Sequence, residues 1–161
     1  MKILLFAPKT DLLYADDEVQ SILRSGNDVT PVLGSIDRQQ FLDEILRSDA
    51  NLLWICSHGN EDGILLSDGI LSASRLTQAA RGRFGVVVLN TCNSFKTAQM
   101  LQNDTEAEII ATIIEAPDEE AFYTGALFAH YLAKSGDTAM AYDLARPGGN
   151  RTYIRLAGKK K

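Results

Sequence analysis

Four short, continuous apolar runs set the strongest limit on what this chain can fold into. They lie at residues 3–7, 52–56, 86–89 and 109–114. The runs are rich in β-branched residues and do not alternate with polar ones, which is typical of strands buried on both faces. A weaker run at 29–33 contains Pro31 and is predicted to lie near a sheet edge, because proline cannot donate to a strand ladder.

Helical patterns fall between these runs. Val19 and Ile22 share one helical face, and Phe41 and Ile45 share another after the capping candidates Ser35 and Asp37. Further helices are predicted over 72–81, 94–102, 118–134 and 137–145, and a last short strand over 152–156. Gly148-Gly149 is predicted to turn the chain into that strand.

Strands that alternate with helices on this scale predict an α/β fold. We expect a three-layer sandwich with a six-stranded, mostly parallel sheet and helices on both faces. The strand at 152–156 is predicted to be antiparallel at one edge. One segment interrupts the alternation, because Asp68-Gly69 within 63–72 predicts a small hairpin. A single domain over 1–158 with a basic tail at 159–161 is the simplest interpretation.

Composition excludes several classes of protein. The net charge is −5, and it is −8 without the three C-terminal lysines, which is a poor match for a nucleic-acid backbone. No apolar run approaches the roughly 20 residues of a membrane span, and the N-terminus lacks the layout of a signal peptide. The only cysteines are Cys56 and Cys92, which indicates free thiols in a reducing cytoplasm rather than a disulfide framework.

The candidate chemistry follows the third and fourth predicted core strands. The third ends in Cys56-Ser57-His58-Gly59, and the fourth in Asn90-Thr91-Cys92. Ligands of open α/β sheets bind beyond the carboxyl ends of the strands. If the two strands are neighbours, an imidazole and a thiol lie side by side, as nucleophilic catalysis by cysteine requires. A helix beginning after Cys92 favours its thiolate, and Gly59 lets the backbone approach a substrate.

These motifs together resemble the CHAT family, a branch of the caspase, separase and metacaspase superfamily. The resemblance rests on Trp54-Ile-Cys-Ser-His58-Gly59, the Asp68-Gly69 hairpin and Val88-Leu-Asn-Thr-Cys92-Asn-Ser, and it extends over roughly 52–145. It implies a caspase-like fold and a thiol protease that hydrolyses peptide bonds without a metal or organic cofactor. His58 would be the general acid/base, Cys92 the nucleophile, and the amides of Gly59 and Cys92 the oxyanion hole.

Substrate binding is predicted on the same analogy. Asn90, two residues before the nucleophile, would line the first specificity pocket. Glu115 and Asp118 follow the fifth strand, and Asp118 resembles the position that separases use to hold an arginine. Cleavage after arginine or lysine is therefore expected. The alternative role of Asp118 is to cap the long helix. A protein or peptide substrate, an activating or inhibitory partner and a homodimer are the partners that this prediction allows.

Other interpretations of these residues remain open. Cys56 is expected to be a core residue, and His130 a helix-packing or surface residue. The acidic run Asp16-Asp17-Glu18 is predicted to be a favourable first turn of a helix. A zinc site from Cys56, His58 and Cys92 lacks paired-cysteine spacing and a fourth ligand. A caspase-like domain whose dyad is idle, acting as a scaffold or signalling partner, is the main alternative to an enzyme.

Overall fold

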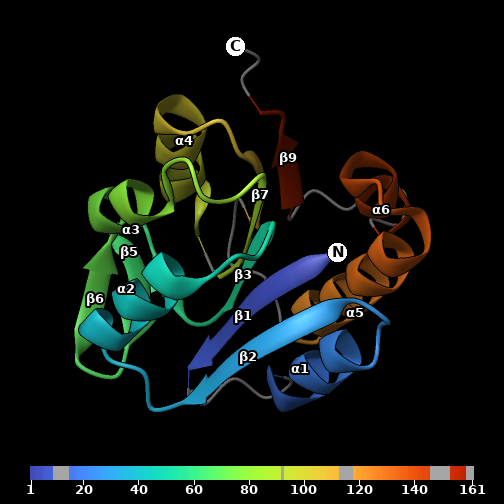
Figure 1. Ribbon diagram of the computed structural model, residues 1–161, viewed down its shortest axis with the longest axis horizontal. Coiled ribbons are helices and arrows are strands. Elements are labelled where there is room, and N and C mark those ends of the chain that lie inside the picture. The colour runs from blue at the N-terminus through green and yellow to red at the C-terminus, as the bar shows by residue number, and fades with distance from the viewer. Residues whose placement is uncertain (9–14, 92, 113–117, 146–152, 159–161) are drawn as a thin grey trace.

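The computed structural model describes residues 1–161 except 9–14, 92, 113–117, 146–152 and 159–161 (Figure 1). The helices in the described residues are α1 Ala15–Leu23, α2 Arg38–Arg47, α3 Ala73–Ala80, α4 Phe95–Asp104, α5 Asp118–Ser135 and α6 Thr138–Ala145. The strands there are β1 Lys2–Pro8, β2 Asp28–Gly34, β3 Leu52–Cys56, β4 Gly59–Asn60, β5 Gly63–Leu66, β6 Gly69–Ser72, β7 Val86–Asn90, β8 Glu108–Thr112 and β9 Tyr153–Leu156.

The main sheet has six strands in the order β2-β1-β3-β7-β8-β9. All neighbouring pairs are parallel except β8 with β9, which are antiparallel. This confirms the predicted mostly parallel sheet and its antiparallel last strand. Strand β2, which contains Pro31, forms the opposite edge, as the proline predicted.

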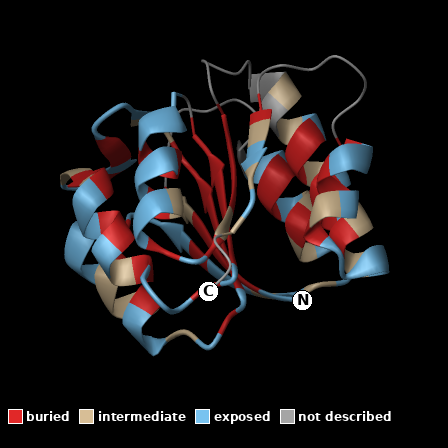
Figure 2. Cartoon of the chain, turned by 90° about the horizontal axis from the view of Figure 1, so that it is seen from above, coloured by how far each residue is buried: buried red, intermediate tan, exposed pale blue. Residues whose placement is uncertain are grey.

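Helices cover both faces of the sheet, so the predicted three-layer α/β architecture is confirmed. Helices α1, α5 and α6 lie on one side, and α2, α3 and α4 lie on the other (Figure 1). The buried strands run between these two helical layers (Figure 2). Alternate strand residues enter two separate cores, with Trp54 and Val88 packing beneath α5 and Ile55 and Leu89 packing beneath α2 to α4. Burial on both faces explains why these runs are continuously apolar.

The helix ends follow local capping. Asp37 caps α2, since its side chain accepts a hydrogen bond from the Gln40 N–H at 2.7 Å. Ser72 caps α3 in the same way through the Arg75 N–H. No helix in the described part of the chain is both long enough and apolar enough to cross a bilayer.

The predicted hairpin is present as β5 and β6, and the short strand β4 extends it to three strands. Its two-residue loop is Ser67-Asp68, one position before the expected pair, because Leu66 and Gly69 are the last paired residues. Gly69 has a φ of 130°, a conformation that side chains other than hydrogen rarely allow. The hairpin tip is fastened to the loop before α2, where the Ser67 N–H donates to the Ile36 carbonyl at 2.8 Å.

Candidate site at the carboxyl edge of the sheet

Strands β3 and β7 are parallel neighbours whose carboxyl ends are level, since Cys56 lies opposite Asn90 in their register. The segments that follow them therefore leave the sheet at the same edge. One carries His58 and Gly59, and the other carries Thr91 and Asn93. The predicted neighbourhood of the two strand ends is present. Cys92 itself lies outside the described residues.

The segment after β3 is held by the hairpin. Ser57 is buried, and its hydroxyl donates to the Leu65 carbonyl at 2.9 Å, while the Leu65 N–H donates to the His58 carbonyl at 3.0 Å. Gly59 lies opposite Ile64 in a pair whose ladder bonds are made by the flanking residues, so its N–H does not point at β5. His58 is half-buried. The hairpin thus fixes the backbone at His58 and leaves the Gly59 amide unused by the ladder.

The segment after β7 is tied to the end of β8. The Thr112 hydroxyl donates to the Thr91 carbonyl. The Ser94 hydroxyl lies 3.0 Å from the Thr112 hydroxyl and donates to the Thr112 carbonyl at 3.1 Å. The Thr112 N–H also donates to the Ser94 hydroxyl at 3.2 Å. Ser94 precedes α4 without capping it by a side-chain bond. Asn93 has a φ of 53°. The chain is therefore anchored on both sides of position 92.

A buried polar network lies directly below these segments. The Glu18 carboxyl, at the start of α1, accepts hydrogen bonds from the Cys56 thiol and from the side-chain amide of Asn90. The Asn90 side-chain carbonyl accepts from the Tyr153 hydroxyl at 2.6 Å. All four side chains are at most 8% exposed. The network links α1, β3, β7 and β9 in one chain of contacts.

Burial changes the acid–base properties of this network. It raises the pKa of Glu18 to about 8 from an ordinary 4.5, although the hydrogen bonds from Cys56 and Asn90 act in the opposite direction. Burial, and then the neighbouring Glu18 carboxyl, raise the pKa of the Cys56 thiol well above its usual range. Glu18 therefore holds a proton at neutral pH, and Cys56 is an un-ionised thiol of low reactivity.

The sheet-facing side of α5 completes the enclosure. A Cβ added at Gly125 would lie 2.5 Å from the Glu18 Oε1 atom, so only glycine lets α5 approach the carboxyl. A cavity of about 20 Å³ beside Asn90 and Tyr153 has room for no more than a water molecule. This cavity is therefore too small to hold a substrate.

Glu18 and Tyr153 belong to this network but were not predicted from the sequence as site residues. Glu18 was predicted to be part of a favourable acidic first turn, yet it is buried and lies four residues before Ile22, on the buried face of α1. That helical spacing was the available signal. Tyr153 carried no local signal, because its partner Asn90 is 63 residues away.

The other predicted site residues are placed in part. Asn90 is the last residue of β7, and its side chain is engaged by Glu18 and Tyr153. Asp118 is the first residue of α5, and Glu115 lies outside the described residues. Cys56 is buried, as expected, and His130 is exposed on α5. Within the described ranges, no three His, Cys, Asp or Glu side chains gather closely enough to hold a metal ion.

Comparisons with known proteins give only distant structural matches. No family model matches the chain, and no curated protein matches it. Among solved structures, the chain is similar to pyridoxal kinase from Staphylococcus aureus. The complex with ADP shows 11% identity and a TM-score of 0.46, and the complex with pyridoxal shows 12% identity and a TM-score of 0.42. Both alignments cover 89% of this chain and 84% of the kinase.

These findings contradict the resemblance to the CHAT family and the cysteine endopeptidase predicted from it, because the matched structures are kinases and not thiol proteases. The physical reason lies in the motifs. Open α/β sheets with many different functions bind their ligands beyond the carboxyl ends of the strands, so a His and a Cys that follow two neighbouring strands do not specify peptide-bond hydrolysis. At these identities and TM-scores the matches say nothing of the activity of this chain.

Proposed function

We propose that the carboxyl edge of β3 and β7 is a reaction site in which the Cys92 thiol attacks a small electrophilic molecule and His58 takes the thiol proton. The proposal rests on the register of the two strands, in which the last residues, Cys56 and Asn90, lie opposite each other. Because the two strands end level, the segment with His58 and the residues on either side of position 92 leave the sheet at one edge, which supports the proposal. Peptide bonds and proteins are not substrates in this proposal.

The surroundings of the two thiols support the choice of Cys92. Cys56 is buried, its thiol donates a hydrogen bond to Glu18, and the pKa of that thiol is raised. Its sulfur is therefore a poor nucleophile. Cys92 directly precedes the Asn93-Ser94 entry to α4, a helix of ten residues. The positive end of a helix favours a thiolate. The contact between the Thr112 and Ser94 hydroxyls holds the start of α4 in place.

The chemistry follows from these groups. The Cys92 sulfur would transfer its proton to a nitrogen of His58 and then add to an electrophilic carbon of the substrate, either as the π pair of a carbonyl moves onto its oxygen or as a leaving group departs with its bonding pair and takes the proton from His58. When that carbon belongs to a carbonyl, the Gly59 N–H is available to stabilise the oxygen that becomes negative. Glu115 and Asp118 remain the proposed substrate-contacting positions. A reducing compartment such as the cytoplasm is part of this proposal, supported by the free thiol of Cys56.

Alkylation by iodoacetamide, with each cysteine mapped by mass spectrometry, tests the proposal. Cys92 is expected to react at pH 7 while Cys56 stays unlabelled in the folded protein. His58→Ala should slow the Cys92 reaction by about tenfold or more, because the thiolate loses its proton acceptor. His130→Ala is the matched control and should leave the rate unchanged, since His130 lies exposed on α5.

The pH dependence supplies the decisive outcome. An activated thiol gives a rate whose midpoint lies well below about 8.5, the ordinary thiol pKa. A Cys92 rate with an ordinary midpoint that is unchanged in His58→Ala would overturn the proposal.

A further inference from the structure

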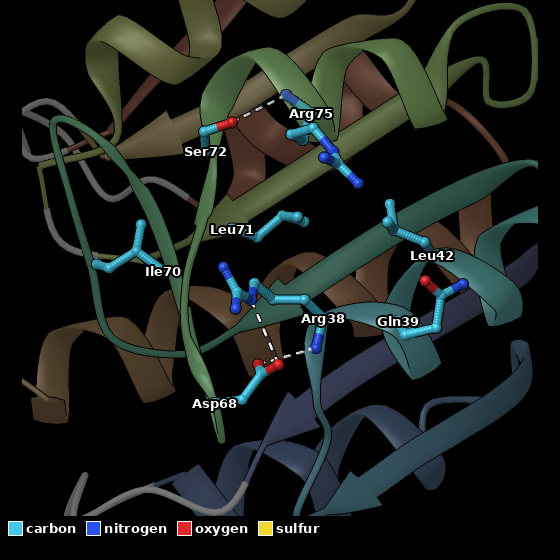
Figure 3. A pocket seen from close by; sticks show the side chains of 8 residues that line it. All are labelled: Arg38, Gln39, Leu42, Asp68, Ile70, Leu71, Ser72 and Arg75. Atoms are coloured by element: carbon cyan, nitrogen blue, oxygen red, sulfur yellow. Dashed lines mark hydrogen bonds and ion pairs between the residues drawn. The ribbon is translucent and has the colours of Figure 1, made fainter.

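A groove of about 640 Å³ lies over the hairpin, between the first turn of α2, strand β6 and the first turn of α3 (Figure 3). Strand β6 is separated from β4, which contains Gly59, by the whole width of β5. The groove is therefore distinct from the reaction site proposed above. Its volume lies within the roughly 300–1,000 Å³ that is usual for small-ligand sites.

The groove combines basic walls with a smaller apolar floor. Arg38 and Gln39 border it from α2, Arg75 borders it from α3, and Leu42 and Leu71 lie between them (Figure 3). Leu71 is buried, whereas both arginines are exposed. A ligand lying here would meet two guanidinium groups from different helices and an apolar surface between them.

The two arginines differ in how they are held. Asp68, at the hairpin tip, accepts a hydrogen bond from the backbone N–H of Arg38 at 3.0 Å. Its carboxylate also forms an ion pair with the Arg38 Nε atom at 3.3 Å. This contact orients Arg38 through one edge of its guanidinium. The Arg75 guanidinium has no hydrogen bond or ion pair with any residue that the structure describes. With Asp68 included, the groove keeps one net positive charge.

Two helix ends add to this field. Helices α2 and α3 have ten and eight residues, and both begin beside the groove. One amide in the first turn of each helix bonds to its cap, Gln40 N–H to Asp37 and Arg75 N–H to Ser72. The helix dipoles contribute a positive potential at these ends. The potential adds to that of the arginines, in a chain whose net charge is −5.

We propose that this groove binds a small organic anion, with a carboxylate or phosphate group between Arg75 and Arg38 and an apolar body against Leu42 and Leu71. A guanidinium matches both oxyanions through paired N–H donors. Arg75 supplies the main contact, because its guanidinium has no hydrogen-bond or ion-pair partner among the described residues. Arg38, already oriented by Asp68, supplies the second.

Benzoate and phenyl phosphate are suitable probes, followed by chemical shifts of backbone amides in the ¹⁵N-labelled full chain. Saturable shifts are expected at residues 38–42 and 70–75. Arg75→Gln should weaken the binding by about tenfold or more, because it removes a charge-assisted pair without breaking a contact within the protein. Arg83→Gln is the matched control, an exposed arginine in the turn after α3, and should leave the affinity unchanged.

The probes also separate the two sources of the anion. Tighter binding of benzoate supports a carboxylate ligand, and tighter binding of phenyl phosphate supports a phosphate ester. Equal binding of neutral benzyl alcohol would overturn the role of charge. Equal binding of inorganic phosphate and phenyl phosphate would overturn the role of the apolar floor. Unchanged affinity in Arg75→Gln would overturn the site itself. None of these outcomes involves His58 or Cys92, so the groove and the reaction site are tested separately.

Discussion

A single hydroxyl holds the loop that precedes α4. Thr112 is 1% exposed, and its Oγ1 atom bonds to the Thr91 carbonyl and contacts the Ser94 hydroxyl. Thr112→Val keeps the shape but leaves those buried groups without their partner. We expect it to lower the free energy of unfolding by about 1–3 kcal/mol and to change the rate of Cys92 alkylation. Urea unfolding and the alkylation assay measure the two effects.

Thr97 provides the matched control for this prediction. It is equally buried, but its Oγ1 atom has no hydrogen-bond partner within the part of the chain that the structure describes. Thr97→Val should be neutral or stabilising, because replacing an unsatisfied hydroxyl by a methyl group removes a desolvation cost. Equal losses in both variants would mean that Thr112 acts through packing alone.

At the scale of elements, α5 approaches Glu18 of α1 closely at one glycine, Gly125. Alanine in place of glycine normally stabilises a helix by about 0.5–1 kcal/mol. At Gly125 the new methyl group would lie 2.5 Å from Glu18 Oε1 and 3.3 Å from Asn90 Nδ2. We therefore expect Gly125→Ala to destabilise the protein by about 1–3 kcal/mol, as overpacking of a core does.

A double-mutant cycle identifies the cause of that loss. In a Glu18→Ala background the methyl group has room, so Gly125→Ala should cost little or should stabilise α5. Urea midpoints at a constant m-value give the coupling energy. Additive losses would place the clash somewhere other than at Glu18.

The elements themselves were largely predictable from local pattern. Continuous apolar runs identified the central strands, Pro31 identified an edge strand, and Asp37 and Ser72 began the helices where expected. Each of these signals acts within a few residues. The buried network was not predictable in this way. Its three hydrogen bonds join residues 38, 72 and 63 positions apart, and only the folded sheet brings them together.

Function was less predictable than architecture for the same reason. The motifs around His58 and Cys92 correctly placed two strand ends side by side, but a strand end fixes a position and not a reaction. The assignment to a protease family went beyond what those positions carry. Glu18, the group whose acid–base chemistry is most altered, lay in an acidic run that is ordinary at the start of a helix.

For the whole molecule, Glu18 links stability to pH. Its pKa is about 8 in the folded protein and 4.5 when unperturbed, so the folded state keeps a proton that the unfolded chain releases. The stabilisation is complete below the unfolded pKa and is lost as the pH rises through about 8. Stability should therefore fall across this window, with a slope of up to about 1.4 kcal/mol per pH unit from this group.

Glu18→Gln separates this contribution from every other titrating group. Glutamine keeps an acceptor for the Asn90 amide and replaces the oxygen that accepts from Cys56 by an NH2 group that can donate to the sulfur. The variant should therefore fold, yet it has no proton to lose. Between about pH 5 and pH 8 the wild-type protein should lose several kcal/mol relative to the variant in urea unfolding. The Cys56 thiol stays protonated throughout, since burial raises its pKa well above the usual range, and it adds nothing to the difference. A difference that stays constant with pH would mean that Glu18 ionises equally in the folded and unfolded chains, and that the carboxyl is not buried as described.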